Sequence, residues 1–190
     1  MSILPETIFS ILIGIGLAAS VGFRIFVPLF ALSLASFYNI IPLNESWQWV
    51  GSSNALLLLG IATIVEILAY FIPWFDNMLD SIAIPLAAVA GTAVMVATVS
   101  DLSPVITWAL AIIAGGGTAT AIKGSTSTSR LASTATTGGI ANPIISTIET
   151  GSSIAMSVFS IFLPIVAIIC VVIIFWLIFK VFKLFKPSKK

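Results

Sequence analysis

The chain contains no histidine, a single cysteine and few charged residues among its 190 positions. Without histidine it lacks the commonest general base, the usual haem ligand and most zinc ligands. The lone Cys170 excludes a disulfide framework and a thiolate metal cluster, so we expect neither a metal nor a cofactor. Charged residues make up 8% of the chain, against about 25% in soluble domains. The net charge of +1 excludes a chain-wide field that would attract nucleic acid.

Hydrophobic residues dominate what is present. They make up 59% of the chain, and the mean hydropathy is +1.19. Because about 20 apolar residues cross a bilayer as a helix, this composition predicts an all-α, polytopic transmembrane bundle of about six to seven segments. We expect a single transmembrane domain over residues 1–182 and a basic tail at 183–190. The apolar runs lie at about residues 7–21, 23–41, 55–72, 82–99, 104–122 and 154–182.

Two of these runs have unusual lengths. The first is short and rich in glycine, so it either crosses the bilayer or enters and returns. It lacks the basic n-region of a cleaved signal peptide, so we keep it as a membrane segment. The last run exceeds the length of one span, so we expect it to tilt, to kink at Pro164, or to project into the cytoplasm.

The basic residues predict the orientation of the chain. Arg24, Lys123, Arg130 and the lysines near the C-terminus should be cytoplasmic, whereas Glu45 and Asp101 lie in loops without basic residues. Seven crossings place the N-terminus outside and the C-terminus inside, and a re-entrant first segment places both inside. A topology signal with a solvated tail is the preferred interpretation of the C-terminal lysines, and recruitment of anionic lipid is the alternative. These lysines are Lys180, Lys183, Lys186, Lys189 and Lys190.

A polar stretch interrupts the apolar sequence between Gly115 and Gly151. It is rich in serine and threonine and contains Lys123, Arg130 and Glu149. Either it is a flexible cytoplasmic loop, or its hydroxyls satisfy broken backbone that other helices surround. Apolar residues continue through it, so we favour broken or re-entrant backbone over residues 136–148. The helix-breaking and polar residues of this part are Gly138, Gly139, Asn142 and Pro143.

Glu66 stands alone in a helix that is otherwise apolar. A central ionisable residue costs about 2.5–3.5 kcal/mol on insertion scales, so its carboxyl should face the bundle and be paired or protonated. It serves either as a structural hydrogen-bond acceptor between helices or as a group that handles substrate, ions or protons. Arg24 is its expected partner by charge.

Glycines precede basic residues at two places in the chain. Small residues allow helices to approach closely, and they also mark broken helices whose amides bind an anionic group beside a fixed cation. A later glutamate follows each group, which suggests a pseudo-repeat of the kind that forms inverted-repeat transporters. The first group is Gly14, Gly16 and Gly22 before Arg24, and the second is Gly115, Gly116 and Gly117 before Lys123.

Asp76 and Asp80 are four residues apart and therefore share a helical face. Two carboxylates are a weak signal for a divalent cation. A cap or a salt bridge to Arg130 or Lys123 is the preferred interpretation.

Three phrases of this sequence resemble one family, the domain of unknown function 4126. They are GIGLAASVGFRIFVPLFALSLA, ALLLLGIATIVEILAYFIPWFDNMLDSIAIPLAAVAG and GSTSTSRLASTATTGGIANPIISTIETG, and the similarity runs from about Gly14 to Pro164. The resemblance implies an integral membrane protein, mostly prokaryotic, and so a bacterial inner membrane; it implies no particular activity. Its motif positions are Gly16, Arg24, Glu66, Pro73, Asp76, Asp80, Arg130, Gly138, Gly139, Asn142, Pro143 and Glu149.

Three functions remain open at this point. The preferred one is a small transporter or channel, in which cations attract an anionic solute or ion and a glutamate couples protons or cations. The second is a membrane scaffold that packs through its glycine faces, and the third is an enzyme acting on lipid headgroups. We expect the lipid bilayer as partner, a homodimer as the assembly that encloses a pathway, and no nucleic acid. The candidate binding residues are Arg24, Glu66, Lys123, Arg130, Asn142 and Glu149.

Overall fold

The computed structural model describes residues 3–100 and 102–185, and the side chains of residues 3–4, 73–77 and 184–185 lie outside the description. Every regular element within those ranges is a helix, which confirms the predicted all-α bundle. The elements are α1 (Ile3–Phe23), α2 (Phe26–Phe37), η1 (Glu45–Gly51), α3 (Ser53–Ala69), α4 (Pro73–Thr98), α5 (Pro104–Leu110), η2 (Ala111–Gly116), α6 (Gly117–Thr137), α7 (Asn142–Phe162) and α8 (Pro164–Phe185).

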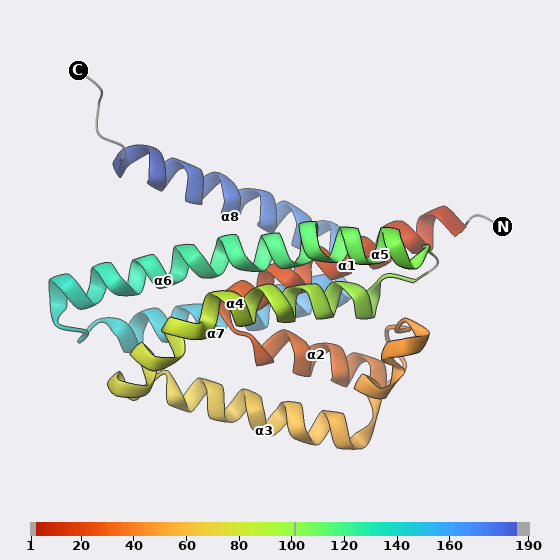
Figure 1. Ribbon diagram of the computed structural model, residues 1–190, viewed down its shortest axis with the longest axis horizontal. Coiled ribbons are helices and arrows are strands. Elements are labelled where there is room, and N and C mark those ends of the chain that lie inside the picture. The colour runs from red at the N-terminus through yellow and green to blue at the C-terminus, as the bar shows by residue number, and fades with distance from the viewer. Residues whose placement is uncertain (1–2, 101, 186–190) are drawn as a thin grey trace.

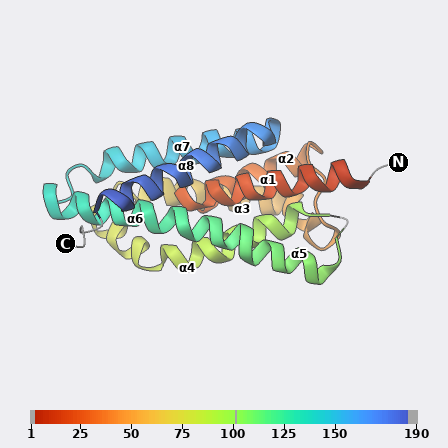
Figure 2. The same ribbon diagram turned by 90° about the horizontal axis from the view of Figure 1, so that it is seen from above.

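The helices run back and forth along the long axis of the molecule (Figures 1 and 2). The start of α1 and the end of α8 lie toward opposite ends of this axis. In the described part of the chain, 5 helices are long and apolar enough to cross a membrane. The count rises to 6 if η1 and α3, which meet at 65°, form one span. Helix α2, with 12 residues, is too short to cross alone. The described part of the chain therefore has five or six candidate spans, where six to seven were expected.

Large apolar side chains face outwards rather than into the bundle. On α3, Leu57, Leu58 and Ile61 are exposed, and much of α8 is equally apolar and exposed. A soluble protein does not present apolar faces of this extent to water. These surfaces face lipid, and the protein is an integral membrane protein.

Helix α1 lies against α4, α6, α7 and α8, and its glycines make this possible. It is continuous through Gly14, Gly16 and Gly22, where we had considered a broken helix. A Cβ atom at Gly14 would lie 2.6 Å from the sulfur of Met95, and one at Gly22 would lie 2.5 Å from Cβ of Ile122. These glycines therefore serve close helix packing, and the chain breaks only after Phe23.

A single helical run of 34 residues joins α5, η2 and α6, from Pro104 to Thr137. The expected break at Gly115, Gly116 and Gly117 is wrong, because one π-helical turn, η2, carries the helix through them. A Cβ atom at Gly115 would lie 2.5 Å from the carbonyl oxygen of Gly91. The absence of side chains lets η2 lie directly on the backbone of α4, whereas Gly117 faces open space.

The chain reverses between α6 and α7 at two glycines in the left-handed region. Gly138 has φ 63° and Gly139 has φ 88°, and Pro143 then occupies the first turn of α7. A second reversal, at Leu163, separates α7 from α8. The apolar run at 154–182 is thus no single tilted span, but the end of α7 and most of α8, which turns back along the bundle (Figure 1). Helix α8 also extends to Phe185, into the predicted tail.

Candidate functional site

Five charged residues from different helices meet inside the bundle. The exposed fraction is 0% for Arg24 and Lys123, 2% for Arg130, 3% for Glu149 and 7% for Glu66. Arg24 lies in the break between α1 and α2, while the others lie on α3, α6 and α7. The polar stretch of the sequence is therefore a helical hairpin that delivers three of these charges to the interior.

Glu66 holds the break between α1 and α2 in place. Its carboxylate accepts hydrogen bonds from the backbone N–H of Ile25, at 2.8 Å, and of Phe26, at 2.9 Å. These N–H groups at the start of α2 have no partner within the helix, so the carboxylate acts as a cap. Glu66 thus bonds the backbone next to Arg24 rather than the Arg24 side chain, which agrees with its structural interpretation.

The guanidinium of Arg24 binds one face of α7. Nε donates to Oγ1 of Thr150 at 3.0 Å, and Nη2 donates to the carbonyl oxygen of Ser146 at 3.0 Å and to its hydroxyl. Nη2 also lies 3.6 Å from Oε2 of Glu149. The other terminal nitrogen, Nη1, is buried and has no hydrogen-bond partner. Arg24 therefore keeps an unused donor within the bundle.

Arg130 reaches the same carboxylate from α6. Its Nε lies 3.1 and 3.2 Å from the two carboxylate oxygens of Glu149, and its Nη2 also donates to Oε2. On its other side, Nε lies 3.9 Å from Oδ2 of Asp80, whose side chain is 18% exposed. Two arginines from different helices thus share one oxygen of Glu149.

Tyr70, in the turn between α3 and α4, lies against all three cations. Its ring centroid is 3.9 Å from Cζ of Arg24, 4.6 Å from Cζ of Arg130 and 5.2 Å from Nζ of Lys123. Its hydroxyl accepts from Nζ of Lys123 at 3.4 Å and donates to Oδ1 of Asp80 at 3.4 Å. Among the described residues, Lys123 hydrogen-bonds only this hydroxyl. The sequence analysis missed Tyr70, although its position one helical turn after Glu66 was a usable signal.

The buried face of α7 is polar along its whole length. Ser20 of α1 donates to the carbonyl oxygen of Ser153 at 2.7 Å, and its hydroxyl lies 2.8 Å from that of Ser157. Such serine contacts let membrane helices pack closely while their polar atoms are satisfied. The spacing of these polar residues was a usable signal in the sequence, because they recur every three or four positions around Glu149 and so share one face of the helix. They are Ser146, Ser153, Ser157 and Ser160.

An opening between α4 and α6 reaches this group of charges. It has a volume of about 260 Å³ and is bordered by Asp80, Ser127 and Arg130 among others. The hydroxyl of Ser127 is buried there without a hydrogen-bond partner. The opening therefore combines two charged groups with an unused hydroxyl.

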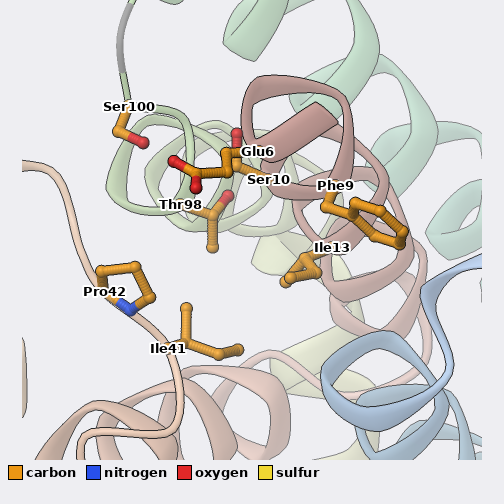
Figure 3. A pocket seen from close by; sticks show the side chains of 8 residues that line it. All are labelled: Glu6, Phe9, Ser10, Ile13, Ile41, Pro42, Thr98 and Ser100. Atoms are coloured by element: carbon orange, nitrogen blue, oxygen red, sulfur yellow. The ribbon is translucent and has the colours of Figure 1, made fainter. Parts of the chain in front are cut away.

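A second cavity, of about 250 Å³, lies at the opposite end of the bundle (Figure 3). Glu6, Ser10 and Thr98 contribute its polar groups, and Ile41 and Pro42 close one side. From Ser10 to Arg24 along α1 is about 21 Å at 1.5 Å per residue. The buried core between them, which includes Leu17 and Val21, separates this cavity from the charges.

Asn142 and Asp76 are the two remaining polar residues of the predicted site. Asn142, at the start of α7, donates to Oγ1 of Thr134 at 3.1 Å and so links α7 to α6. Asp76 belongs to the side chains outside the description, so only Asp80 of the predicted pair can be placed. No group of three or more acidic or cysteine side chains suited to a metal occurs among the described residues.

Comparison with known proteins identifies the family. The family described as Domain of unknown function (DUF4126) matches residues 11–184, a range that includes every charged residue of the site. No curated protein and no solved structure matches the chain. This integral membrane protein therefore belongs to the DUF4126 family, in agreement with the resemblance of its three motifs.

Proposed function

We propose that the protein is a small transporter that binds an anionic solute at a cationic cluster formed by Arg24, Lys123 and Arg130. The observation that carries this proposal is the buried, unused donor of Arg24 beside a lysine whose described hydrogen bonding is limited to one hydroxyl. An anionic group placed between them would accept from both.

The energetic cost of these cations supports a functional role. On insertion scales, a central arginine or lysine costs about 2.5–3.5 kcal/mol in a membrane helix. Glu149 lies against the two arginines and Glu66 is engaged by backbone N–H groups, whereas the described hydrogen bonding of Lys123 is limited to the Tyr70 hydroxyl. A purely structural network would be expected to satisfy each buried donor.

The cluster is accessible through an opening, which supports a transport function rather than a purely structural role for these charges. The opening between α4 and α6 borders Arg130, whereas the apolar core closes the route to the cavity in Figure 3. This is the arrangement of a carrier open toward one side. Lys180 and Lys183 lie at the end of the bundle nearer the cluster, so we place this end in the cytoplasm of a bacterial inner membrane.

A homodimer is the assembly we propose, because a chain of five or six spans has few helices with which to enclose a pathway. The outer face of α6 suits such contact, since a Cβ atom at Gly117 or Gly124 would meet no atom of another helix within 4 Å.

Reconstitution into liposomes tests the proposed function. Purified protein should support flux of one anion from a panel that includes short carboxylates, phosphate and halides. Arg24→Gln should reduce this flux at least tenfold, because it removes the unused donor and a fully buried cation of the cluster. Lys180→Gln is the matched control: it removes a cation from the surface of α8 and should leave flux within twofold of the wild type.

Folded wild-type protein that moves none of these anions would contradict transport. Equal flux through wild type and Arg24→Gln would remove the cluster from the pathway.

A further inference from the structure

We infer that the carboxylate of Glu149 occupies the place of the solute's own anionic group, so that the solute is a monocarboxylate that displaces Glu149 when it binds. This inference rests on the proposed transport of an anion. It adds the chemical class of the solute and the group with which the solute competes.

The geometry around Glu149 is that of a bound carboxylate. Arg130 approaches both of its oxygens with Nε and adds Nη2, and Arg24 approaches Oε2 from the break between α1 and α2. A planar guanidinium matches a planar carboxylate with two parallel donors, a match that a spherical halide does not offer. The site is therefore already shaped for one group with two oxygens in a plane.

Addition of an anion without displacement would place two negative groups beside each other. The unused Nη1 of Arg24 belongs to the same guanidinium whose Nη2 lies 3.6 Å from Glu149. An anion on Nη1 would therefore lie within a few ångströms of the Glu149 carboxylate, in surroundings that screen charge poorly. Departure of Glu149 removes this repulsion and frees both arginines for the solute.

The attachment of α7 allows Glu149 to move. Helix α7 begins two turns before Glu149, directly after the left-handed Gly138 and Gly139. The other bonds from Arg24 to α7 go to neutral groups of Ser146 and Thr150, which hydrogen-bond equally well to water. Loss of the two ion pairs would thus leave the N-terminal part of α7 attached to Arg24 through hydrogen bonds to neutral groups alone.

A comparison of acetate binding by wild type, Glu149→Gln and Asp80→Asn tests the inference on the full chain in detergent. Glu149→Gln removes the internal competitor and should bind acetate at least tenfold more tightly than wild type. Asp80→Asn is the matched control, because it also removes one negative charge beside Arg130 but leaves Glu149 in place. It should tighten binding less than threefold, by its general electrostatic effect alone.

Thermal unfolding gives a second readout. Glu149→Gln leaves two arginines buried without their carboxylate, so its Tm should fall, and acetate should raise it more than it raises the Tm of wild type. If Glu149→Gln does not fold, Glu149→Asp replaces it, since the shorter side chain draws the carboxylate back from the arginines and should also tighten acetate binding.

Equal or weaker acetate binding by both Glu149 variants would overturn displacement. Preference of wild type for phosphate or chloride over acetate would overturn the class of solute. Either result can occur while the liposomes still show anion flux, so failure of this inference is distinguishable from failure of the proposed function.

Discussion

At the scale of single residues, Tyr70 connects charges that come from three separate parts of the chain, which are the α1–α2 break, α4 and α6. Its ring lies within 5.2 Å of all three cations, and its hydroxyl joins Lys123 to Asp80. Cation–π contacts contribute more where both partners are shielded from water, as these are. The ring, more than the hydroxyl, should therefore hold the cations together, because both hydrogen bonds are 3.4 Å long.

Substitutions at Tyr70 separate these two contributions. Tyr70→Phe keeps the ring and should lower the free energy of unfolding by about 1 kcal/mol, because it removes two hydrogen bonds that are both long and therefore weak. Tyr70→Leu also removes the ring and should cost about 2 kcal/mol more. Chemical unfolding in detergent measures both values. Equal loss in the two variants would show that the hydroxyl, not the ring, organises the cluster.

At the scale of helices, the same residue type has opposite effects at neighbouring positions. Gly115 lies on the backbone of Gly91, so helix η2 and helix α4 can approach only while both positions lack side chains. Gly117, two residues later, faces open space. Glycine occurs both where two helices pack closely and where a helix breaks. The sequence alone could not distinguish these two uses, so it suggested a break over all three glycines.

Alanine at these two positions should shift stability in opposite directions. Gly115→Ala places a Cβ atom against a carbonyl oxygen that cannot rotate away, and should lower the free energy of unfolding by about 1–3 kcal/mol. Gly117→Ala meets no atom and should raise it by up to about 1 kcal/mol through helix propensity. Thermal unfolding of the two variants measures the difference, since each variant adds a single methyl group. Similar effects at both positions would contradict the close contact of η2 and α4.

At the scale of the whole molecule, composition alone predicted an all-α membrane bundle, and the single charge in an otherwise apolar helix predicted that Glu66 would be buried. Arg24, Glu66, Lys123, Arg130 and Glu149 stand out because burial of each requires compensation. Their pairing could not be predicted, since it depends on the packing of α1 and α7. Glu66 therefore caps α2 where an ion pair was expected. The pseudo-repeat stays a prediction, because its two glutamates have different partners.

The arrangement of the long α5–η2–α6 run predicts the topology of the chain. Ser103 precedes this run and Thr137 ends it, and both are exposed. If the 34-residue run crosses the bilayer, these positions lie on opposite sides, with Thr137 on the side of the basic residues. In a Cys170→Ser background, a membrane-impermeant maleimide should label Ser103→Cys in intact cells. It should label Thr137→Cys only after permeabilisation, because this position lies on the cytoplasmic side, toward which we expect the cluster to open. Labelling of both positions in intact cells would contradict the crossing, and the reverse pattern would place the cluster's opening outside the cell.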